Sequence, residues 1–421
     1  MLKVNKKMSI RWLIFGLIII ILLLPARFFQ LFSITFFNVE SNIAVNYVNF
    51  VDLLIAVTGF LCFFLEPRQV FIKKSKVIFV FPLISSICLL GLIIKGRTEY
   101  GGELISKTII LCSTIIIANY VLFNFSAKEI CYLLLIPLMI LVVASFFLRD
   151  YGGYETSNRV GTIGFGSNEA ASFACMIVLS ILFVKNMNKF IKILLIIICF
   201  GCILITSSRR ALIIISLILI LFFIGKMIIF FRKKRIRVRS LIIAPSIFIL
   251  ALFIFFLNLN EIVEFIQSTP LFVRLSYTNR IGERLFDFGE RINIYSVVFE
   301  KISSSPFIGT CGCDLLLAQG SFSHSHNIFL QLFATYGLIL GGVIVAYFIY
   351  TFLNVIYIVK IKKQLLSILI FPISIYVMYI IGDQFGYLLW NPKGLFLIVF
   401  CMVLINSYKS YMLIYKNMKE E

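Results

Sequence analysis

Charged residues are scarce in this 421-residue sequence. Asp, Glu, Lys and Arg together make up 14% of it, whereas about 25% is usual for a soluble domain. Apolar residues make up 61%, against roughly 45–50% in soluble proteins. This composition excludes a cytosolic enzyme, a disordered chain and a disulfide scaffold, and it is typical of a protein that crosses a membrane several times.

Acidic residues are the scarcer kind of charge, with 19 Asp and Glu against 39 Lys and Arg, which gives a net charge of +20. In a soluble protein such an excess would suggest a nucleic-acid partner. Here no basic face with interleaved aromatic residues lies outside the apolar runs, so we expect no nucleic acid. Cytoplasmic loops of membrane proteins collect Lys and Arg, which explains the excess.

Potential metal ligands are also few. Eight of the ten cysteines lie inside apolar runs, where a free cysteine behaves as a small hydrophobic residue. The other two form Cys311-Gly-Cys313, a pair without partner ligands that we interpret as structural. The sequence therefore predicts neither a metal site nor a cofactor.

Long apolar runs are abundant, and a membrane-spanning helix needs about 20 such residues. The first run lacks a clear small-x-small cleavage site, so we interpret it as a helix and not as a signal peptide. The sequence predicts an all-α polytopic membrane protein with about 12 transmembrane helices. We place them at 9–27, 46–64, 77–94, 105–123, 130–148, 168–184, 191–207, 211–231, 240–258, 334–358, 364–382 and 394–412.

Charge asymmetry predicts the orientation. With the N-terminus inside, 25 of the 39 basic residues fall on the inner side, together with only four acidic residues. The largest group is the run Arg232–Arg239. Because inner loops are expected to be basic, both termini are predicted to be cytoplasmic.

The predicted organisation has three parts. Residues 1–258 hold helices one to nine, 259–327 form one large external, periplasmic loop, and 328–421 hold helices ten to twelve. A second external loop runs over 149–166. Transporters built from two parallel halves usually have a long inner connection after helix six. That connection is only about seven residues here, so the working surface is predicted to be external.

The large loop contains one predicted amphipathic helix of about 13 residues. Asp287 and Glu290 fit a capping box at its start, and the Ser-Ser-Ser-Pro306 segment ends it. We expect this helix to lie on the outer membrane surface or under the loop. One apolar face at spacings of three and four is made by Ile292, Tyr295, Val298, Phe299 and Ile302.

The only two histidines, His324 and His326, come just before the tenth span. Histidine titrates near neutral pH and is the commonest general base. Two alternatives stay open: a metal-binding pair, for which no third ligand is nearby, and a histidine that caps helix ten.

External arginines suggest an anionic ligand. Arg209 and Arg210 lie at the outer turn between two very apolar helices, and Arg159 and Arg291 lie in the external loops. Guanidinium groups grip phosphate oxygens in pairs of hydrogen bonds, so the set suits a pyrophosphate. The alternative for Arg209 and Arg210 is snorkelling to lipid headgroups.

Four motifs follow one another over about residues 150–345. They are Ser157–Asn168 (SNRVGTIGFGSN), Thr206–Leu212 (TSSRRAL), Gly289–Tyr295 (GERINIY) with Ser305–Gly309 (SPFIG), and His326–Leu330 (HNIFL) with Tyr336–Gly341 (YGLILG). In this order they resemble the O-antigen polymerase and O-antigen ligase family of bacterial membrane glycosyltransferases. Arg210 stands where that family usually has Gly.

The resemblance implies a fold akin to the GT-C glycosyltransferases and a metal-independent transfer of glycan from undecaprenyl diphosphate. It implies that His326 is the general base on the acceptor hydroxyl, and that Arg291 and Arg209 act catalytically on the diphosphate. Its implied location is the bacterial inner membrane, and its implied partners are the lipid-linked glycan and the bilayer, with a chain-length regulator as a further candidate. The predicted substrate-binding residues are Arg159, Arg210, Arg284, Asn327 and, from topology alone, Asp383.

Three functions are weighed. The leading one is a polymerase of lipid-linked repeat units for O-antigen or capsule, because Tyr336–Gly341 looks more like polymerases. The second is a ligase that moves the finished glycan onto lipid A core. The third, a flippase for lipid-linked oligosaccharides, would need ionisable residues along the middle of several spans, whereas here most lie at span ends.

Overall fold

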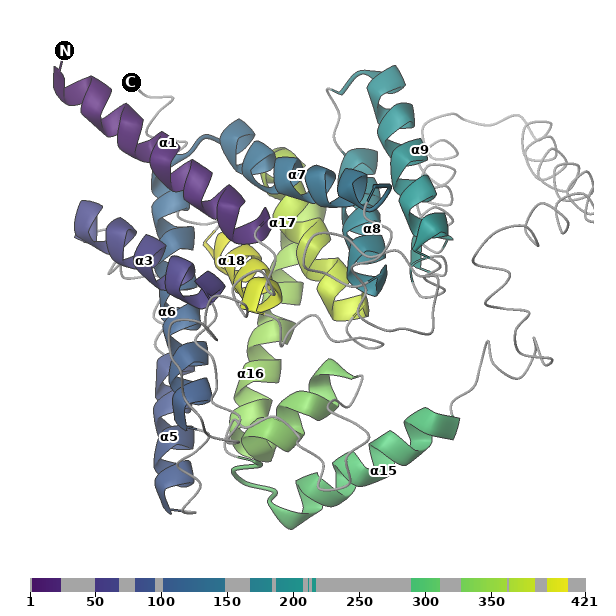
Figure 1. The fold of residues 1–421 in the computed structure, drawn as a ribbon. Coiled ribbons are helices and arrows are strands. Elements are labelled where there is room, and N and C mark those ends of the chain that lie inside the picture. The colour runs from purple at the N-terminus through teal and green to yellow at the C-terminus, as the bar shows by residue number, and fades with distance from the viewer. Residues whose placement is uncertain are drawn as a thin grey trace, which may run out of the picture. The chain divides into compact units, whose positions relative to one another are not determined.

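The computed structural model describes residues 2–23, 50–67, 80–94, 101–147, 167–183, 187–206, 211, 214–216, 289–310, 327–361, 363–382 and 392–407. The elements in these ranges are all α-helices, which agrees with the predicted class. In chain order they are α1 (Leu2–Leu23), α3 (Phe50–Leu65), α5 (Val80–Ile94), α6 (Gly101–Asn124), α7 (Ala127–Ala144), α8 (Ser167–Phe183), α9 (Lys189–Ile205), α15 (Gly289–Ser304), α16 (Ile328–Ile361), α17 (Lys363–Gly382) and α18 (Pro392–Asn406) (Figure 1).

Ten of the twelve apolar runs coincide with these helices. The other two, at 211–231 and 240–258, lie almost wholly outside the described residues. Within the described part of the chain, two helices are long and apolar enough to cross a membrane, at Lys107–Asn124 and Ile328–Val359, and five shorter apolar helices accompany them.

The chain divides into two compact units. One contains α1, α3, α5, α6, most of α7 and α15–α18, and the other contains the end of α7 with α8 and α9. In the second unit, α9 begins at Asn188, whose side chain accepts a hydrogen bond from the Phe190 amide and caps the helix. Ser145 donates a hydrogen bond to the Cys202 sulfur at 3.1 Å, which joins the segment after α7 to α9.

The first unit is built around α18. Every residue from Phe396 to Ile405 is buried, as expected for a helix that is apolar on all sides. This helix packs against α6, α16 and α17, and α6 packs in turn against α3 and α5.

Close approach between α3 and α6 depends on small residues. A Cβ at Gly59 would lie 2.6 Å from the Cβ of Ser113, so no larger residue fits at this crossing. Small residues let helix backbones approach closely where no water drives their association.

Polar side chains join α16 to its neighbours. The Asn354 side chain donates to Asn406 Oδ1 at 2.9 Å, Asn406 donates to Thr351 Oγ1 at 2.9 Å, and the Tyr376 hydroxyl donates to the Phe348 carbonyl. These bonds link α16 to α18 and α17 across an otherwise apolar contact.

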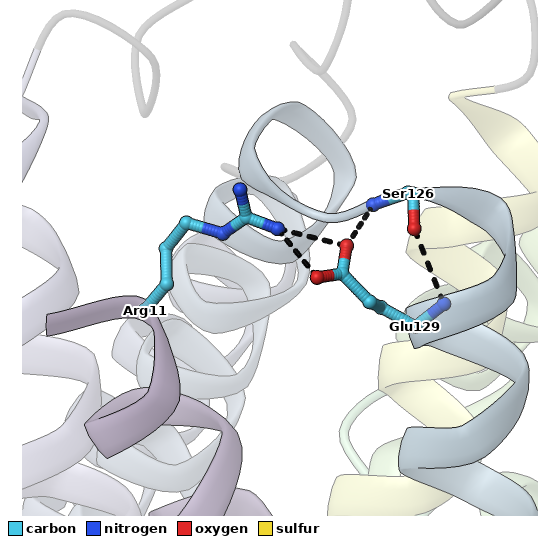
Figure 2. A network of polar contacts seen from close by, with 3 residues as sticks. All are labelled: Arg11, Ser126 and Glu129. Atoms are coloured by element: carbon cyan, nitrogen blue, oxygen red, sulfur yellow. Dashed lines mark hydrogen bonds and ion pairs between the residues drawn. The ribbon is translucent and has the colours of Figure 1, made fainter. Parts of the chain in front are cut away.

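A charged network joins α1 to the turn between α6 and α7 (Figure 2). Arg11 donates two hydrogen bonds to the Glu129 carboxylate, at 2.7 and 2.8 Å, and its guanidinium lies 5.3 Å from the centre of the Phe125 ring. Ser126 and Glu129 form a capping box, in which the Ser126 amide donates to Glu129 at 2.6 Å and the Glu129 amide donates to the Ser126 hydroxyl at 3.4 Å. The middle of α1, at Arg11, therefore lies beside the first turn of α7, at Glu129.

The network should make stability depend on acid pH. Burial alone would raise the pKa of Glu129, but the hydrogen bonds from Ser126 and Arg11 outweigh it and hold the pKa below the usual carboxyl value. A carboxylate with a lowered folded-state pKa stabilises the protein above its unfolded value of about 4.3, and this contribution is lost as the pH falls through the folded-state pKa.

We expect Glu129→Gln to cost about 1 kcal/mol at pH 7, because the pair is partly exposed. That corresponds to a melting temperature lower by about 2 °C in detergent, and the difference from wild type should shrink below pH 4. Lys128→Gln, which removes a charge from an exposed neighbour, is the control. An equal loss in both variants would show that the network contributes nothing specific.

Candidate functional site

The amphipathic helix that the sequence predicts is α15, and it packs on the beginning of α16. Val298, Ile302 and Ala334 form a buried apolar cluster, against which Tyr295, Leu330 and Phe333 pack. The predicted apolar face is confirmed for Tyr295, Val298 and Ile302. It is wrong for Phe299, which is 55% exposed, because that residue lies about 100° around the helix from Val298.

Asn327 begins α16. Its side-chain oxygen accepts hydrogen bonds from the amides of Phe329 and Leu330, at 3.0 and 3.1 Å. These are the bonds of an N-cap. The cap that the sequence suggested for a histidine is therefore made by Asn327.

Gly337 breaks α16 into two parts. Its backbone has φ 74° and ψ 173°, a conformation that a residue with a side chain rarely adopts. In an unbroken helix the Leu338 amide would donate to the Ala334 carbonyl. Instead, Leu338 donates to the Pro306 carbonyl at 2.6 Å, and Ala334 accepts from the Thr310 amide at 3.0 Å. The turn after α15 thus satisfies both groups that the break releases.

Two glycines make this crossing possible, and we name it the glycine joint (residues 305–310 and 334–338). A Cβ on Gly337 would lie 2.2 Å from the Phe307 carbonyl oxygen, and a Cβ on Gly309 would lie 2.4 Å from the Ala334 carbonyl oxygen. Gly309 also has a positive φ, 60°. The two backbones touch where any side chain would separate them.

The joint and the apolar cluster together set the direction of α15. The turn that ends α15 meets the end of the first part of α16, and residues earlier in α15 share the cluster with residues earlier in α16. The two segments therefore run side by side in the same direction (Figure 1). Their N-terminal ends lie at the same end of the pair, and those ends carry Arg291, in the first turn of α15, and Asn327.

The structure places few of the predicted site residues. Arg291 is helical and Asn327 is the cap, whereas the other predicted catalytic and binding residues lie outside the described residues: His326, Arg209, Arg159, Arg210, Arg284 and Asp383. His326 directly precedes the cap in the sequence. The sequence did not predict the glycine joint. The two segments that form it nevertheless overlap the Ser305–Gly309 and Tyr336–Gly341 motifs.

Comparison with known protein families identifies this part of the chain. Residues 193–345 match the family model described as O-antigen ligase. This segment of the chain is similar to the O-antigen ligase family. The match includes α15, the glycine joint and the start of α16, and it supports the family resemblance. Three of the four motifs lie inside it, whereas Ser157–Asn168 lies before its first residue. A search of curated proteins found no significant match.

The similarity to the O-antigen ligase family indicates a broad function. The match supports, in general terms, a membrane enzyme that processes lipid-linked glycans. Exposed apolar side chains along α16 after the joint, such as Val343, Ile349, Phe352 and Leu353, agree with a membrane location, because soluble monomers rarely expose contiguous apolar surface of this kind. Six of the predicted site residues lie inside the matched segment: Arg209, Arg210, Arg284, Arg291, His326 and Asn327.

Proposed function

We propose that the protein polymerises undecaprenyl-diphosphate-linked oligosaccharide repeat units on the outer face of the inner membrane, for O-antigen or capsule. The observation that carries the proposal is the pairing of α15 with the start of α16. It brings the helix end that holds Arg291 to the same end as Asn327, the residue after His326.

The chemistry follows from these groups. His326 takes the proton from an acceptor hydroxyl, whose oxygen then attacks the anomeric carbon of the donor sugar. The bond between that carbon and the diphosphate oxygen breaks, and the lipid diphosphate leaves. Arg291 and Arg209 stabilise the charge on the leaving diphosphate, and Arg159, Arg210 and Arg284 hold it. Positive charge placed where negative charge develops is often the largest catalytic contribution, and the positive end of the α15 dipole adds to it.

The cytoplasmic side of the proposed arrangement has separate support. Arg11, in the middle of α1, contacts Glu129 in the first turn of α7, and the charge asymmetry assigns both residues to the cytoplasmic side. The proposed architecture has twelve transmembrane helices, both termini in the cytoplasm and a GT-C-like fold. Its three parts are residues 1–258, 259–327 and 328–421.

Ligation onto lipid A core is the second candidate, because the matching family model is described as O-antigen ligase. A sugar-stained gel of surface polysaccharide from a strain that lacks the gene separates the two. For a polymerase we expect lipid A core that carries a single repeat unit and no ladder. A bare core, with polymer accumulated on undecaprenyl diphosphate, would mean ligation, and an unchanged ladder would refute both functions.

A further inference from the structure

Thr335 lies in the last turn of α16 before Gly337, and among the described residues its hydroxyl is one of two buried hydroxyls without a hydrogen-bond partner, the other being that of Ser374 in α17. The side chain is wholly buried, yet its Oγ1 makes no hydrogen bond to any residue that the structure describes. Four other buried hydroxyls in the described helices donate to the carbonyl four residues earlier, at 2.6–2.9 Å: Thr58 to Leu54, Thr114 to Ile110, Ser180 to Met176 and Thr351 to Tyr347.

Such a hydroxyl weakens the fold. Removing a hydroxyl from water without a compensating hydrogen bond costs about 1–3 kcal/mol in proteins. A valine has nearly the same shape and would avoid this cost. A hydroxyl of this kind in the interior calls for a partner, such as a ligand, that completes its hydrogen bonding.

The position of Thr335 indicates where such a ligand lies. Asn327, Gln331 and Thr335 are spaced four residues apart, so they form a polar row along one side of the first part of α16. Gln331 is also buried. The row starts at the residue after His326 and ends at the joint, and none of its members belongs to the apolar cluster with α15.

We propose that Thr335 binds a sugar hydroxyl of the lipid-linked glycan, and that the polar row is the sugar subsite beside the catalytic end of the helix pair. This inference rests on the proposed glycosyl transfer. The row is made of two amides and one hydroxyl and carries no charge, which suits neutral sugar hydroxyls and not a diphosphate. A sugar held there would be shut off from bulk water, which favours transfer to an acceptor over hydrolysis.

Thr335→Val tests the proposal, because it removes the hydroxyl and keeps the shape. We expect the melting temperature of the purified protein to be unchanged or higher. We also expect kcat/KM for polymerisation to fall about tenfold, the loss of roughly one hydrogen bond to the substrate. The substrate for the assay is the lipid-linked repeat unit extracted from the deletion strain. Thr335→Ser keeps the hydroxyl and should retain most of the activity.

Thr351→Val is the matched control in the same helix. Thr351 already bonds to Tyr347 and Asn406, so its loss should lower the melting temperature and leave the activity per folded molecule unchanged. Full activity of Thr335→Val would overturn the subsite. If Arg291→Ala were inactive in that same assay, only the subsite would fail, whereas an active Arg291→Ala would refute the proposed mechanism as well.

Discussion

Gly337→Ala is expected to abolish polymer formation. The new Cβ would lie 2.2 Å from the Phe307 carbonyl oxygen, and the positive φ of this residue adds about 1–2 kcal/mol of strain for any residue with a side chain. Because the clash is with backbone, no rotamer can relieve it, and the turn after α15 has to separate from α16. We expect a loss of at least about 3 kcal/mol in unfolding free energy and no visible ladder on a sugar-stained gel.

The matched control is Gly342→Ala, five residues further along the same helix. A Cβ there meets nothing within 4 Å, so alanine should leave activity intact and gain up to about 1 kcal/mol of helix stability. Gly309→Ala places a Cβ against the α16 backbone from the other segment of the joint. It should also abolish polymer formation. A normal ladder from Gly337→Ala at wild-type protein levels would show that the joint is not needed.

Arg291→Ala is expected to lower the transfer rate by more than about 100-fold while the protein still inserts and melts as wild type does. A fall in rate of this size is expected when one group that stabilises a developing charge is lost. His326→Ala should be equally inactive, because no base would remain for the acceptor hydroxyl. The measurement is transfer from the lipid-linked repeat unit by purified protein.

Lys301→Ala supplies the control for charge. Lys301 lies in the last turn of the same helix, away from the end that carries Arg291, so its removal should change the rate by less than about twofold. If the two variants lost activity equally, a general effect of positive charge on α15 would explain the data. Normal polymer from His326→Ala would refute the general-base role.

Much of the helical framework was predictable because apolar runs of about 20 residues carry their signal locally in the sequence. Ten runs are helices in the structure. The amphipathic helix α15 was also predictable, since Tyr295, Val298 and Ile302 repeat at helical spacing and pack as expected. The tenth helix was placed too late, at 334 and not at Ile328, because its first part is a separate segment that packs on α15 and contains Gln331 and Thr335.

The sequence by itself determined the membrane class, the helical class, the family motifs and the candidate base and arginines, because composition, periodicity and short motifs are local properties. Only the tertiary structure decided what the glycines of two motifs do. Gly309 and Gly337 are 28 positions apart in the sequence. They allow a close backbone contact that no local sequence pattern encodes. That contact, with the hydrogen bonds exchanged around it, aligns α15 with the start of α16 and leaves the Thr335 hydroxyl buried within the joint.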